Sequence, residues 1–65
     1  MTVASWEFHA LAVMFIATHG DAAEEEAAIR LRAAEEEGDR GQMVVWTEIG
    51  LKLPIVRAAQ AKTGG

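Results

Sequence analysis

A run of eight apolar residues, ALAVMFIA at positions 10–17, constrains the fold of this chain more than any other feature. A helix over this run has apolar side chains on all sides, and such a helix is normally buried on more than one side. The chain has 65 residues, which is one domain at most. Because so small a domain buries little of its surface, we expect another chain to help cover this helix.

The apolar run does not indicate a membrane span or an export signal. A spanning helix needs about 20 apolar residues, and a signal peptide needs a positively charged start. The first 29 residues contain no Lys or Arg, and Glu7 lies where that charge belongs. The chain also has no cysteine, which excludes disulfides and thiolate metal sites and fits a reducing compartment. We therefore expect a cytoplasmic protein with no membrane partner.

Three helices are expected in a single domain, residues 1–65, because strand signals are absent and helix stop signals recur. The expected helices cover approximately residues 3–18, 22–37 and 40–61, and residues 62–65 are expected to fray. Gly20 and Gly38 are natural left-handed stops for the first two helices. Pro54 lacks an amide hydrogen, so the third helix should kink or restart near residue 54. The predicted fold is all-α, a small three-helix bundle completed by dimerisation.

Two Gly-Asp junctions predict where helices begin. The segments DAAE and DRGQ, which begin at Asp21 and Asp39, have the spacing of a capping box. In each, the Asp side chain accepts a hydrogen bond from the backbone amide three residues on. The side chain of Glu24 or Gln42 reaches back to the backbone amide of that Asp. Thr2 or Ser5 should cap the first helix.

The first and third expected helices each carry two apolar stripes when their residues are placed at 100° intervals around the helix axis. On the first helix, the stripe that we assign to the core consists of Trp6, Val13 and Ala17, with His9, Ala10 and Ile16 alongside. On the third helix, the core stripe consists of Met43, Trp46, Ile49 and Leu53. The second stripes have nothing in the chain to cover them, so we predict that they form a partner interface. This possible interface consists of Phe8, Leu11, Phe15, Val44, Leu51 and Ile55. The alternative is that the first helix is sandwiched between the other two.

No residue pattern indicates a catalytic, cofactor or metal site. His9 and His19 lie on different faces of one helix, so they cannot bind one ion as an i, i+4 pair would. A zinc site from His19, Asp21 and Glu24 is geometrically conceivable but lacks a usual ligand set. The two Glu triplets, at 24–26 and 35–37, point in three directions each, and we interpret them as solvated faces. We therefore predict no catalytic residue, cofactor or metal ligand.

Charge is unevenly distributed along the chain. Residues 1–39 hold nine carboxylates and two arginines, a balance of −7, whereas residues 40–65 hold four cations and one carboxylate, a balance of +3. The acidic part argues against nucleic acid as a partner, because such binding requires a basic surface. The asymmetry is compatible with electrostatic complementarity between two copies.

Several short motifs resemble a family of small uncharacterised helical proteins of sphingomonad-type alphaproteobacteria, a domain of unknown function. They are HGD at 19–21, IRLR at 29–32, GD at 38–39, and the residues Trp46, Ile49 and Leu53. The resemblance covers roughly residues 6–53, and it departs from the family pattern at Gln42, where a glycine is expected. It implies a compact helical fold in a bacterial cytosol and implies no activity.

The sequence thus predicts a non-enzymatic, homodimeric structural or protein-interaction module. One alternative is an adaptor, antitoxin-like or inhibitor-like protein that docks a different partner on the Phe8, Leu11 and Phe15 face. A more distant alternative is a metal-dependent enzyme that uses the acidic residues.

Overall fold

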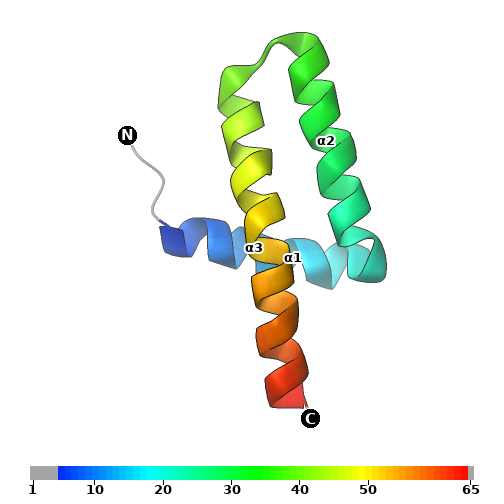
Figure 1. The fold of residues 1–65 in the computed structure, drawn as a ribbon, viewed down its shortest axis with the longest axis vertical. Helices are drawn as coiled ribbons and strands as arrows, with labels where there is room; N and C mark the ends of the chain where they lie inside the picture. Colours follow the sequence, from blue (N-terminus) through cyan, green and yellow to red (C-terminus); the bar gives the residue numbers. More distant parts are fainter. Residues whose placement is uncertain (1–4, 65) are drawn as a thin grey trace.

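Three α-helices make up the described part of the chain (Figure 1). The computed structural model describes the backbone of residues 5–64 and the side chains of residues 6–62. The helices are α1 (Ser5–His19), α2 (Ala23–Glu37) and α3 (Arg40–Gly64), and a short 3-10 turn, η1 (Gly20–Ala22), joins α1 to α2. No strand occurs between residues 5 and 64, so the fold is all-α, as predicted.

The helices are not arranged as the expected three-helix bundle. The backbone is helical in two continuous stretches, 5–37 and 40–64, because η1 carries the chain from α1 into α2 without a loop. Gly20 has a left-handed φ of 58°, which turns the chain sharply at this point. As a result α2 and α3 form an antiparallel hairpin, and α1 crosses it instead of running alongside (Figure 1).

The turn between α2 and α3 follows the sequence prediction. Gly38 ends α2 in the left-handed conformation, with φ of 71°. Asp39 then caps α3, since the amide of Gln42 donates to the Asp39 Oδ1 atom at 3.1 Å. The Gln42 side chain does not complete a capping box, because its Oε1 atom accepts a bond from the Trp46 indole at 3.1 Å.

The predicted capping box at the start of α2 is wrong. Asp21 lies inside η1, and the N-cap position of α2 is Ala22, with no side-chain cap. The 3-10 turn already continues the helical backbone, so α2 has no free start for Asp21 to cap. The Glu24 side chain is bound by Arg57 of α3 instead. The predicted start of the first helix at residue 3 lies outside the described residues.

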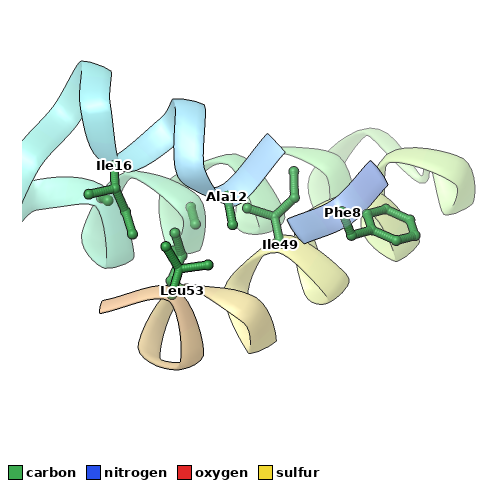
Figure 2. Packing of buried hydrophobic residues seen from close by; sticks show 8 residues of the cluster. Phe8, Ala12, Ile16, Ile49 and Leu53 are labelled. Atoms are coloured by element: carbon green, nitrogen blue, oxygen red, sulfur yellow. The ribbon is translucent and has the colours of Figure 1, made fainter. Parts of the chain in front are cut away.

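The core forms where α1 crosses the hairpin (Figure 2). Its α1 side chains come from Phe8, Ala12 and Ile16, one helical turn apart. They pack against residues of the two other helices, namely Ala23, Ala27, Ile49, Leu53 and Val56. Ala12 and Leu53 are both fully buried, and the small Ala12 side chain allows α1 to approach α3 closely.

The predicted assignment of the α1 stripes is therefore wrong, except that Ile16, predicted beside the core stripe, is in the core. Trp6 was expected in the core, but its exposed fraction is 70%. Phe8 was expected at a partner interface, but it is buried in the core at 8%. Both faces of α1 are apolar, so periodicity alone could not distinguish them. On α2 the buried side consists of Ala23, Ala27 and Ala34.

The predicted break at Pro54 does not occur, because α3 is a single helix from Arg40 to Gly64. Proline removes only the one amide that would bond Gly50, the residue four before it. Leu53 and Val56, on either side of Pro54, are both buried against the core and hold this part of the helix in place. The expected fraying over 62–65 is not seen up to Gly64, and residue 65 lies outside the described residues.

Within the described part of the chain, no helix combines the length and apolar character that crossing a membrane requires.

Candidate interaction surfaces

The six residues predicted to form a partner interface do not lie together. Phe8 is buried, which removes it from any interface, and Phe15 is half-buried against the core. The other four side chains are exposed: Leu11 by 42%, Val44 by 59%, Leu51 by 60% and Ile55 by 56%. The residues of α3 lie on the side opposite Leu53, which packs against α1, so α3 separates them from α1. The six therefore cannot form one continuous surface.

The side of α1 that faces away from the hairpin is mostly apolar, with Glu7 beside Met14 as its charged residue. We call it the outer α1 face, and it consists of Trp6, Ala10, Val13, Met14 and Ala17. All five residues are exposed, with exposed fractions of 70% for Trp6, 65% for Met14 and 36% for Val13. None of them is ionisable. An exposed apolar patch of this kind marks an interaction surface in a globular protein.

The outer α1 face was missed because its spacing is that of a core stripe. Trp6, Ala10, Val13 and Ala17 are separated by four, three and four residues, which is the pattern of any helix side that packs against another helix. Ala12 lies at the centre of the true core stripe and is fully buried, but Ala10 and Ala17 on the outer α1 face are equally small. A sequence with two apolar sides does not show which of them its own chain will cover.

Phe15 belongs to an aromatic cluster with α3. Its ring lies 5.3 Å from that of Trp46 and 4.3 Å from that of His19. The guanidinium of Arg30 on α2 lies 5.6 Å from the Phe15 ring centroid and 5.4 Å from that of Trp46, within the range of cation–π attraction. His19 thus has a structural role at the end of α1. Trp46 is half-buried at the edge of the core rather than at its centre.

An open groove of about 230 Å³ runs between α2 and α3 on the uncovered side of the hairpin. Ala28 and Leu31 line it from α2, and Gly50 and Leu51 line it from α3. Trp46 lies at its edge and also lines a second hollow of about 220 Å³ beside Arg30. The first groove is mostly apolar, so it is suited to a side chain of another protein more than to a charged ligand.

Arg57 fastens α3 to the turn between α1 and α2. Its guanidinium donates two bonds to the Glu24 carboxylate, at 2.5 Å from Nε and 2.7 Å from Nη2, and a third to the carbonyl of Gly20. The hydrogen bond from Arg57 holds the pKa of Glu24 below its ordinary value, and the same bond raises the pKa of Arg57. Sequence reasoning missed this contact because the two residues are far apart in the chain.

The acidic residues do not gather into a metal site. Among the residues that the structure describes, no group of three or more His, Asp or Glu side chains is placed to hold an ion. Glu24, one of the three residues considered for zinc, is occupied by Arg57. Glu26 lies 3.9 Å from Arg30 as an i, i+4 pair on the exposed side of α2.

Comparisons of the chain with protein-family models, with curated proteins and with solved structures found no match. The resemblance to the alphaproteobacterial family therefore stays a prediction.

Proposed function

We propose that this protein is a non-enzymatic interaction module that forms a homodimer through the outer α1 face. The observation that carries the proposal is the exposure of Trp6, Val13 and Met14 on a mostly apolar helix side. Burying these side chains against a second copy would remove a large apolar area from water, at about 25 cal/mol per Å². A two-fold contact of this kind is the commonest form of self-association.

The chemistry-bearing side chains support a structural role over a catalytic one. His19 stacks on Phe15, Glu24 binds Arg57, and Asp39 caps α3. Each of these contacts stabilises the fold. A catalytic group would instead be left available for a substrate. A cytoplasmic, bacterial setting is part of the same proposal and rests on the sequence.

The proposal is tested by placing a charge in the outer α1 face. Ala10→Glu puts two carboxylates into the contact, whereas Ala58→Glu makes the same change on an exposed part of α3. We expect Ala10→Glu to be monomeric and as helical as the wild type, and Ala58→Glu to associate like the wild type. Equal association of both variants in sedimentation equilibrium would contradict the proposal.

A second candidate function is that of an adaptor for a different protein, and the groove between α2 and α3 favours it. The sequence predicted an adaptor face formed by Phe8, Leu11 and Phe15. Because Phe8 lies in the core, that face is not available to a partner. The groove is bordered by α2, whose first turn carries Glu24, Glu25 and Glu26. Its fitting occupant is an amphipathic helix with apolar residues beside Lys or Arg. Loss of such binding in Leu51→Glu, with self-association unchanged, would identify this function.

A further inference from the structure

The outer α1 face has the residue spacing of a two-helix seam. The intervals of four, three and four residues between Trp6, Ala10, Val13 and Ala17 match alternating a and d positions of a heptad. Along this seam the side chains alternate in size: Trp6 is large, Ala10 is small, Val13 is of medium size and Ala17 is small. All four side chains are exposed, so nothing in the described chain fills the holes between them.

Resting on the proposed homodimer, we infer that two α1 helices pair antiparallel, with the two-fold axis between Ala10 and Val13. In this register Trp6 packs on Ala17 of the partner subunit, and Ala10 packs on Val13 of the partner subunit. Every layer then combines a larger with a smaller side chain, so no layer holds two tryptophans or two alanines. Parallel pairing would instead oppose each residue with its own copy, which gives one overfilled layer at Trp6 and two underfilled layers, at Ala10 and Ala17.

Charge favours the same direction. The first turn of α1 carries Glu7. Antiparallel pairing opposes the two helix dipoles. It also separates the two Glu7 residues by about 13 Å along the seam, at 1.5 Å per residue, whereas parallel pairing places them at the same level.

The size of the seam determines how tight the dimer is. From Trp6 to Ala17 it is about 17 Å long, so it lies at the small end of specific interfaces. The dimer is therefore concentration-dependent, with Trp6 as its largest anchor. Because the contact is two-fold, it is closed at two copies, and each hairpin lies on the far side of its own α1.

Cysteine cross-linking tests the register, since the chain has no cysteine of its own. A mixture of Ala10→Cys and Val13→Cys should form a cross-linked heterodimer on oxidation, because these positions face each other. Ala17→Cys alone should remain uncross-linked, because antiparallel pairing places its two copies about 17 Å apart along the seam. Efficient cross-linking of Ala17→Cys with itself, and none in the mixture, would overturn the antiparallel arrangement while leaving the homodimer in place.

A reciprocal exchange tests the pairing of Trp6 with Ala17 independently. Trp6→Ala should raise the dissociation constant by at least about 30-fold, and Ala17→Trp should also weaken the dimer by setting two indoles in one layer. The double variant should recover association, because each tryptophan again faces an alanine. Both positions are exposed, so circular dichroism should report a wild-type fold in all three variants. A double variant weaker than either single variant would refute the register, and a wild type that is monomeric throughout would refute both the register and the homodimer.

Discussion

Leu53 is the residue on which the crossing of α1 and α3 most depends, so we expect Leu53→Ala to destabilise the protein strongly. Its side chain is fully buried between α1 and α3 (Figure 2). The substitution removes three carbon atoms, worth about 2.4 kcal/mol of burial at about 0.8 kcal/mol each. Because the crossing helices cannot collapse fully onto the space, a cavity term brings the expected loss to about 3–4 kcal/mol.

This loss is a large share of the whole free energy of unfolding, which for a chain of this length is about 3–10 kcal/mol. Thermal unfolding followed by circular dichroism should show Tm lowered by at least about 12 °C. Leu51→Ala is the matched control, because Leu51 is two residues away on the same helix and its side chain is 60% exposed. It should change the stability by no more than about 0.5 kcal/mol. Both variants are measured at the same low protein concentration. If Leu53→Ala and Leu51→Ala lower the Tm equally, the assigned core is refuted.

Three further perturbations test the turns and the Arg57 contact. Asp39→Ala removes the cap of α3 and should cost about 1 kcal/mol, measured by urea unfolding; an unchanged midpoint would argue against the cap. Gly38→Ala should cost about 1–2 kcal/mol, because an added Cβ meets no atom and only the left-handed backbone resists it; a rise in Tm would contradict that geometry. The lowered pKa of Glu24 predicts stability that is complete above pH 4.5 and lost as the pH falls through the folded-state value. Arg57→Gln should reduce this loss in melts between pH 3 and pH 7, and an identical pH profile for both proteins would contradict the assignment.

The helices and their turns could be predicted from sequence because local chemistry determines them. Gly38 requires a left-handed φ, Asp39 supplies a cap, and the alanines of α2 combine high helix propensity with a narrow inner side. These signals act over a few residues and do not depend on the rest of the fold. The same local reasoning failed at Asp21, because whether a helix starts there depends on whether the preceding one has ended.

The arrangement of the helices could not be predicted in the same way. α1 has two apolar sides, and the choice between them depends on contacts with α2 and α3, which are distant in the sequence. Ala12 lies at the centre of the buried side, yet in the sequence it is one alanine in a run of eight apolar residues. The contact between Glu24 and Arg57 is equally invisible, since it joins residues 33 positions apart. Consequently the predicted interface contained one core residue, Phe8, and omitted the outer α1 face.

The measurement that tests the account most directly is the mass of the wild-type protein in solution over a range of concentrations. Sedimentation equilibrium between about 5 µM and about 500 µM covers the affinities expected for a small interface. We predict that the mass rises from 7.0 kDa towards twice that value and stops there. A mass of 7.0 kDa at every concentration would contradict the claim that the outer α1 face is covered by a second copy.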